Sequence, residues 1–311
     1  MVSAAFHTPG DATAPAAAAT DADADADPVS RPAANEATMP IEAPRPAPAR
    51  TPIDWRGIAL KVLPPVISLG LLIGLWALAT MKGGGSFPTP AATFDAAVQL
   101  FSDPFYRNGP NDQGIGWNIL NSLGRVGMGF GLAALVGIPL GFAIGRFEFA
   151  NRMVSPLIAL LKPVSPLAWL PIGLLAFKSA NPAAIWTIFI CSIWPMVVNT
   201  AVGVQRVPQD YLNVARVLKL SEWKVITRIL LPAVLPYVLT GVRLSVGTAW
   251  LVIVAAEMLT GGVGIGFWVW DEWNNLNVAH ILIAIFVIGT VGLLLEWALI
   301  SLAKHFTFEE D

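Results

Sequence analysis

Long apolar stretches alternate with short polar segments along most of this 311-residue chain. A helix needs about 20 mostly apolar residues to cross a bilayer. Stretches of that length predict membrane-spanning helices at 58–80, 123–145, 154–177, 183–204, 232–258 and 279–303. Prolines interrupt several of them, and 154–177 is the stretch least suited to one straight helix, because Pro163, Pro166 and Pro171 fall close together. The pattern predicts an all-α polytopic membrane protein with about six transmembrane helices.

A polar and basic segment, 213–232, lies within the connection 206–231 between two of these apolar stretches. Val214, Val217 and Leu218 recur at helical spacing, which predicts an amphipathic helix of about three to four turns with one apolar stripe. Ser221 and Glu222 mark a second helix start, and the next span is expected to begin at Pro232. Periodicity alone leaves two interpretations open: a helix lying on the membrane surface, or a surface that a partner protein contacts.

The segment 82–122 and the loop after the fifth stretch carry aromatic side chains. Spacing from Phe94 to Phe101 predicts a short interfacial helix. Trp268, Trp270 and Trp273 fit a belt at the membrane–water interface better than a site for aromatic substrate recognition.

Glycines recur every four residues in two of the predicted spans. Small residues on one helix face let helices approach closely in lipid. The sequence therefore predicts packing surfaces at the following positions: Gly70 and Gly74; Gly127 and Gly131; Gly137, Gly141 and Gly145.

The first 52 residues differ from the rest. The whole chain is 55% hydrophobic and only 13% charged, with a mean hydropathy of +0.63, whereas soluble domains carry about 25% charged residues. Residues 1–52 are instead rich in Ala, Pro and Asp and have no apolar period, so we expect a disordered tail before a membrane domain at 53–311. An inert tail is the simpler interpretation, and a regulatory or partner-docking arm is the alternative.

Lysine and arginine are distributed unequally between the two sides of the predicted spans. Cytoplasmic segments of membrane proteins are enriched in these residues. If the N-terminus is cytoplasmic, the outer segments hold only Lys82, Arg107 and Lys178. We therefore expect both termini, and the connection 206–231, in the cytoplasm.

Motifs for catalysis are absent from the sequence. It has no GxxxxGK[ST] phosphate loop, a single cysteine, Cys191, and three scattered histidines. The glycine cluster Gly261–Phe267 lacks the GxGxxG spacing and is predicted to end a helix in a tight turn. We expect no enzyme activity, no metal, no cofactor and no nucleic-acid partner; the net charge of −2 predicts no partner by itself.

The segment 213–232 resembles the cytoplasmic loop of ATP-binding-cassette (ABC) importer permeases, whose pattern is Glu-Ala-Ala, three residues, Gly, nine residues, Ile-x-Leu-Pro. Ala215 matches the second alanine, and Ile229, Leu231 and Pro232 match the end at the same spacing. The chain departs from the pattern at Asn213, Val214 and Lys219, which replace Glu, Ala and Gly.

In that family the loop helix docks on the ATP-binding subunit and transmits its closure to the channel. The resemblance implies that the ATPase-coupling residues here are Asn213, Val214, Ala215, Arg216, Val217, Leu218, Lys219, Ser221, Glu222, Ile229, Leu231 and Pro232.

Polar side chains inside the spans are the candidates for a translocation pathway. Arg243 and Glu257 lie fourteen residues apart in one predicted helix, about 21 Å, too far to pair directly. We expect Glu257 to hydrogen-bond to neighbouring helices, whereas lipid or structural pairing and pathway lining both stay open for Arg243. Neutral groups can donate to a passing anion without trapping it, and the neutral candidates are Asn199, Thr200, Ser245 and Thr248.

A narrower resemblance covers most of residues 60–303. Val214–Pro236 and Ala256–Asn275 are similar to the nitrate/nitrite permease subunits of ABC importers, whose relatives carry taurine, other sulfonates, cyanate and bicarbonate. The resemblance implies a type I ABC importer permease fold in a bacterial inner membrane and import of nitrate or a similar small anion. It also implies a homodimer of permease subunits, separate ATP-binding subunits, and a periplasmic or lipid-anchored substrate-binding protein. Alternatives are a taurine/sulfonate or bicarbonate permease, an ATP-independent secondary transporter or channel, and a membrane scaffold.

Overall fold

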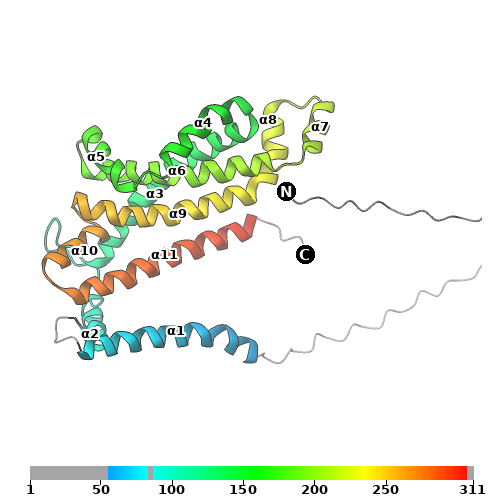
Figure 1. The fold of residues 1–311 in the computed structure, drawn as a ribbon. Helices are drawn as coiled ribbons and strands as arrows, with labels where there is room; N and C mark the ends of the chain where they lie inside the picture. The colour runs from blue at the N-terminus through cyan, green and yellow to red at the C-terminus, as the bar shows by residue number, and fades with distance from the viewer. Residues whose placement is uncertain (1–54, 83–86, 307–311) are drawn as a thin grey trace, which may run out of the picture. The chain divides into compact units, whose positions relative to one another are not determined.

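The computed structural model describes residues 55–82 and 87–306, which are helical apart from short connections (Figure 1). The first six helices are α1 (Trp55–Lys82), α2 (Pro90–Leu100), α3 (Ile115–Arg146), α4 (Glu148–Leu161), α5 (Pro166–Phe177) and α6 (Ala180–Gln205). They are followed by α7 (Gln209–Val217), α8 (Glu222–Val225), the π-helical turn η1 (Ile226–Leu230), α9 (Leu231–Thr260), α10 (Ile265–Asn274) and α11 (Val278–Phe306). Within these ranges the only β-type pairing is an isolated bridge, Arg107–Gln113, so the all-α class is confirmed. The proposed tail, 1–52, lies outside the described residues.

Five helical segments in the described ranges are long and apolar enough to cross a membrane, or six if α4 and α5 form one broken span. The axes of α4 and α5 are bent by 101°. A proline disfavours the helical conformation of the residue before it, and Ser165, which precedes Pro166, has an extended ψ of 135°. As the prolines indicated, 154–177 is not one straight helix, and its first half, α4, begins earlier than predicted, at Glu148.

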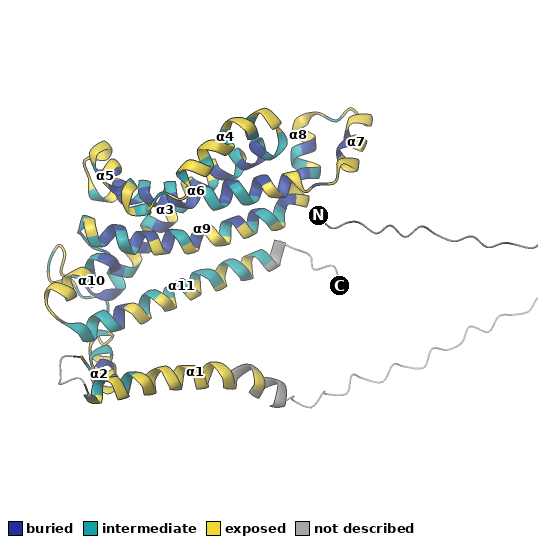
Figure 2. Cartoon of the chain, viewed as in Figure 1, coloured by how far each residue is buried: buried dark blue, intermediate teal, exposed yellow. Residues whose placement is uncertain are grey.

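Helices α3, α6 and α9 form the centre of the bundle, where buried side chains concentrate (Figure 2). The predicted glycine packing is confirmed at Gly137, Gly141 and Gly145. A Cβ at Gly141 would lie 2.6 Å from the Cβ of Thr200, and one at Gly145 would lie 2.5 Å from the Cβ of Val204, so α6 passes directly over these positions.

The other predicted glycine stripes do not pack within the described chain. No described heavy atom lies within 4 Å of a Cβ added at Gly70, Gly74, Gly127 or Gly131. The first pair belongs to α1, whose apolar side chains are mostly exposed (Figure 2). The expected helix near Phe94 is present as α2, which begins after Thr89; the Thr89 hydroxyl accepts a hydrogen bond from the Ala92 N–H.

Candidate functional site

The loop between α6 and α9 holds one short helix, α7, and the start, α8, of a long helix that runs on into α9. Helix α7 starts at Gln209, before the predicted segment, and ends at Val217. The amides of Lys219 and Leu220 close it by bonding back to the carbonyls of Arg216 and Ala215, both at 3.0 Å, which is the Schellman pattern of helix ends. The predicted three to four turns are therefore wrong, because this C-cap stops the helix before Ser221.

Lys219 has a left-handed backbone, with φ at +49°. This is the position at which the ABC permease pattern has glycine, the residue that adopts such a conformation without a steric penalty. The loop therefore has the turn that the pattern requires, although the residue at this position is lysine rather than glycine.

One face of α7 attaches the loop to the bundle. Leu212 and Ala215 are buried in a cluster with Val225 and Leu230, and Phe142 of α3 belongs to the same cluster. Ala215 is only 2% exposed. A larger side chain there would separate α7 from the helices beneath it.

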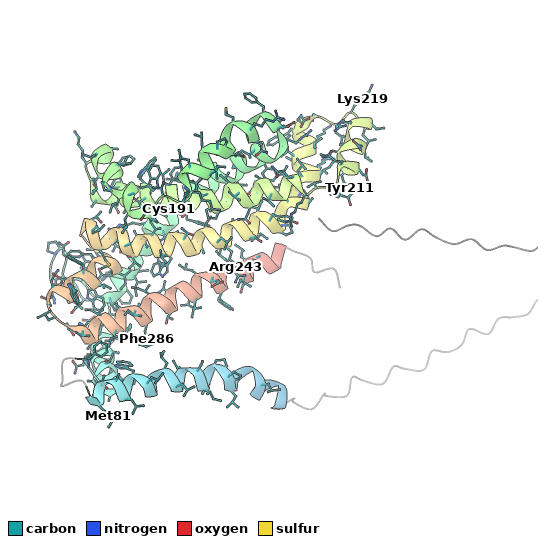
Figure 3. All side chains as sticks on the ribbon, in the orientation of Figure 1. Met81, Cys191, Tyr211, Lys219, Arg243 and Phe286 are labelled. Carbon is teal, nitrogen blue, oxygen red and sulfur yellow. The ribbon has the colours of Figure 1, made fainter. Side chains whose placement is uncertain are left out.

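The opposite face of the loop is apolar and exposed. Val217 is 81% exposed, and Val214 and Leu218 are exposed beside it. Tyr211 and Trp223, which the periodicity did not single out, are also exposed. We call these five side chains the exposed loop face; Figure 3 shows Tyr211 and Lys219 at this end of the bundle.

The second helix start at Ser221 and Glu222 is present as α8. Glu222 Oε1 accepts a hydrogen bond from Arg146 Nη2 at 3.0 Å, which ties α8 to the end of α3. The coupling candidates Asn213 and Arg216 lie on α7 and bond to each other at 3.2 Å.

The helix that begins at α8 continues through η1 into α9 without a break. Pro232 has no N–H, and its ring collides with the carbonyl four residues back in a regular α-helix. The wider π-helical turn Ile226–Leu230 ends two residues before it. The span was expected to begin at Pro232, but the helix starts ten residues earlier, at Glu222. Ile229 packs against the loop cluster, whereas Leu231 is exposed.

The five pathway candidates fall in three different places. Thr200 is fully buried against Gly141 of α3, where it has no surface to offer a passing ion in this conformation. Asn199 and Ser245 lie where α6 meets α9; the Ser245 hydroxyl donates to the Ser192 carbonyl at 2.7 Å.

Arg243 and Thr248 line a groove of about 860 Å³ between α9 and α11. Nε and Nη2 of Arg243 both donate to Oε1 of Glu296 on α11, and the Nε distance is 3.0 Å. The Arg243 and Glu296 side chains are 52% and 45% exposed. Figure 3 shows Arg243 beside α11. The structure thus shows structural pairing of Arg243, one of the two possibilities that the sequence left open; lining of the pathway stays a prediction.

Glu257 hydrogen-bonds to neighbouring helices, as expected. Its carboxylate accepts from Ser122 Oγ at 2.7 Å and from Arg125 Nη1 at 2.5 Å, both on α3, and from the Gly266 N–H at 3.0 Å. Arg125 also donates to Asn181 of α6 at 2.6 Å. Sequence reasoning missed Arg125 as the partner of Glu257; its charge inside an apolar stretch was the available signal.

The glycine cluster after α9 makes this network possible. Gly261 and Gly262 have φ values of +77° and +91°, which confirms the predicted tight turn. A Cβ at Gly264 would lie 2.4 Å from the carboxyl carbon of Glu257, and one at Gly266 would lie 2.1 Å from the Val254 carbonyl oxygen. Only glycine lets the start of α10 approach α9 so closely.

The interface belt expected at the tryptophans does not include all three. Trp270 and Trp273 are exposed, but Trp268 is only 7% exposed and stacks on His280 with ring centroids 5.7 Å apart. His280 Nδ1 in turn lies 3.0 Å from Glu272. Trp268 is therefore a core residue.

These features define a multi-span helical membrane protein with a separately capped loop that exposes an apolar face. Residues 137–307 match the family described as the binding-protein-dependent transport system inner membrane component. The chain belongs to this family of ABC importer permeases, and it is a multi-pass inner-membrane protein.

Curated relatives cover most of the chain. The chain is 47% identical to the nitrate import permease protein NrtB of Synechocystis sp. over 76% of its length and 86% of the relative. It is 45% identical to the corresponding protein of Leptolyngbya laminosa, over 83% and 94%. It is 44% identical to the bicarbonate transport system permease protein CmpB of Synechocystis sp., over 80% and 90%.

A solved structure supports the fold alone. The MetNI methionine ABC transporter, in an inward-facing conformation, matches with a TM-score of 0.55 at 13% identity, covering 61% of this chain and 95% of the matched chain. The type I ABC importer permease fold is thereby confirmed.

Proposed function

We propose that this permease imports nitrate or a similar small anion, such as nitrite, cyanate or bicarbonate, in an ABC importer whose ATP is hydrolysed on separate subunits. The observation that carries the proposal is the similarity, over most of the chain, to permeases named for nitrate and for bicarbonate. A small monovalent anion needs only weak, distributed donors along its path. The scarcity of basic residues in the described spans agrees with such a substrate.

The exposed loop face is the proposed contact with the ATP-binding subunit. An apolar helix face that is open to solvent gains free energy when a partner covers it. The coupling residues Val214, Val217 and Leu218 belong to this face, while the buried side chains of Ala215 and Leu212 hold it to the bundle. Ile229, Leu231 and Pro232 lie where the loop passes into α9.

The proposed assembly has a defined orientation in the membrane and contains two permease subunits and a binding protein. We place the loop end and both termini in the cytoplasm, because Lys and Arg concentrate there in the sequence. The end that carries α10 then faces the periplasmic or lipid-anchored binding protein. The subunits form a homodimer, and the tail at 1–52 is dispensable for transport.

The polar groups at the centre of the spans are the proposed pathway. Arg243 is the cation that biases it toward anions, and Asn199 is a neutral donor. The hydroxyls of Ser245 and Thr248 join as donors only when they leave the carbonyls to which they now donate. Thr200 joins them only if α3 and α6 separate during transport, because it is buried between them here.

ATP-driven uptake in proteoliposomes that hold the complete complex tests the proposal, with nitrate, bicarbonate and taurine compared. We expect nitrate uptake that requires both ATP and the binding protein. Taurine uptake without nitrate uptake would assign the chain to sulfonate transport. Uptake that persists without ATP would instead support a secondary transporter or channel.

A further inference from the structure

Arg243 and Glu296 place a charged pair near the middle of their membrane-spanning helices. Arg243 is twelve residues from the start of α9 and seventeen from its end, about 18 Å and 26 Å along the helix. Glu296 is eighteen residues into α11. Counted from the helix ends next to α10, Arg243 and Glu296 therefore lie at a similar depth, about 26 Å and 27 Å along their helices, within a hydrocarbon depth of about 30 Å that begins at those ends.

The described residues cover these two charges only in part. Each side chain is about half exposed, and both open into the α9–α11 groove. Charges at this depth that face acyl chains are costly, and they usually face a protein interior or a water-filled path. A groove that is part of the transport path proposed above would meet this requirement, whereas a lipid-facing groove would not.

The chemistry of the pair indicates what else can occupy the arginine. A guanidinium group donates from a planar fork that matches the oxygen edge of a carboxylate. Nitrate and bicarbonate are planar ions that present the same kind of O–X–O edge, whereas a sulfonate is tetrahedral. The Glu296 carboxylate on Arg243 occupies the position that such an anion would take.

We propose that Arg243 binds the passing planar oxyanion and that Glu296 is its built-in competitor, which displaces the anion and keeps its binding weak. This inference rests on the proposed function. Conduction requires sites that the ion can leave, and a carboxylate one contact away supplies a replacement partner for the arginine as the anion departs.

Among the described residues that line the groove, only Arg243 and Glu296 carry a charge. The hydroxyls of Thr240 and Thr248 already donate to carbonyls of their own helix, at 2.8 Å and 2.9 Å. Most of the remaining lining is apolar, including Leu251 and Leu293. An anion entering the groove would therefore find its strongest donor at Arg243.

Inhibition by nitrate on the release side of the membrane tests the inference, because this effect bypasses the binding protein. Proteoliposomes with the whole complex are preloaded with unlabelled nitrate at increasing concentrations, and ATP-driven uptake of labelled nitrate is measured. The readout is the internal nitrate concentration that halves this uptake. Glu296→Gln should lower that concentration by about tenfold and Arg243→Gln should raise it by about tenfold, since a charged partner strengthens or weakens such a contact by that order. Methanesulfonate on the release side should inhibit Glu296→Gln less than nitrate does.

Arg152→Gln and Glu148→Gln are the matched controls, because that exposed pair lies outside the groove; neither should shift the inhibition. If the Arg243–Glu296 pair only held α9 to α11, Arg243→Gln and Glu296→Gln should shift the half-inhibiting nitrate concentration in the same direction. That result would overturn the inference. If a single variant does not assemble, the double variant Arg243→Gln/Glu296→Gln should show the weak inhibition of Arg243→Gln; inhibition as strong as in the wild type would also overturn it. A wild-type complex that takes up neither nitrate nor bicarbonate would refute the proposed function itself.

Discussion

At the scale of single residues, Glu257 is a carboxylate that the fold surrounds with donors. Its side chain is 1% exposed, and it receives hydrogen bonds from α3 and from the first turn of α10. A buried charge is tolerated when it is paired and hydrogen-bonded. The network therefore fixes the end of the bundle at which α9 turns into α10.

Glu257→Leu should strongly destabilise the protein, because Arg125, whose side chain is only 14% exposed, would lose its charged partner. Removing one member of a buried pair typically costs about 3–5 kcal/mol. Glu257→Gln keeps the size of the side chain and should cost less. Thermal unfolding of the purified complex measures both, with the exposed Glu148→Gln as the control; equal melting temperatures for all three variants would show that the network contributes little.

Lys219 is a second residue of interest at this scale, because its left-handed backbone conformation favours glycine. A left-handed conformation costs a non-glycine residue about 1–2 kcal/mol. Lys219→Gly should therefore preserve uptake and stabilise the loop by up to about 1 kcal/mol, whereas the β-branched Lys219→Val should destabilise it. Hydrogen exchange of the Leu220 amide, which bonds to Ala215, reports the change. Lys224→Gly, within helix α8, is the control and should be unfavourable; a destabilising Lys219→Gly would contradict the argument.

At the scale of elements, close packing of α3 on α6 depends on glycines. Gly141→Ala would bring its Cβ within 2.8 Å of the Val197 carbonyl oxygen, and backbone cannot move aside easily. We expect a loss of about 1–3 kcal/mol and a lower melting temperature. Gly127→Ala, on the same helix but with no described atom within 4 Å, should be neutral or stabilising. Similar losses at both positions would mean that Gly127 packs against another subunit.

The sequence predicted the elements better than their connections. Spans such as 232–258 follow from apolar length, a local property that the bilayer dictates. The break between α4 and α5 was visible only as a cluster of prolines, because the bend depends on what each half packs against. The partners of Glu257 and Arg243 could not be predicted, since Arg125 and Glu296 lie on other helices and no periodicity links residues so far apart in the chain.

At the scale of the whole molecule, the exposed loop face and the proposed pathway share one helix. Residues 222–260 run as a continuous helix from α8 through η1 to α9, and this helix carries Arg243. The buried loop cluster holds α7 to the start of this helix, and the ion pair Arg146–Glu222 holds that start to α3. We expect a displacement of the loop to be transmitted along this helix toward Arg243.

Val217→Asp tests whether an ATP-binding subunit docks on the exposed loop face, because it places a charge on that face. If an ATP-binding subunit covers that face, burying an unpaired carboxylate should cost about 2 kcal/mol or more, an affinity loss of roughly 30-fold. Uptake and retention of the ATPase should fail, while membrane insertion persists, since Val217 is exposed in the chain itself. Asn213→Glu is the control: it adds the same charge to α7 at the position where the family pattern has glutamate, and it should retain both. A Val217→Asp complex with its ATPase and normal uptake would show that the partner docks elsewhere.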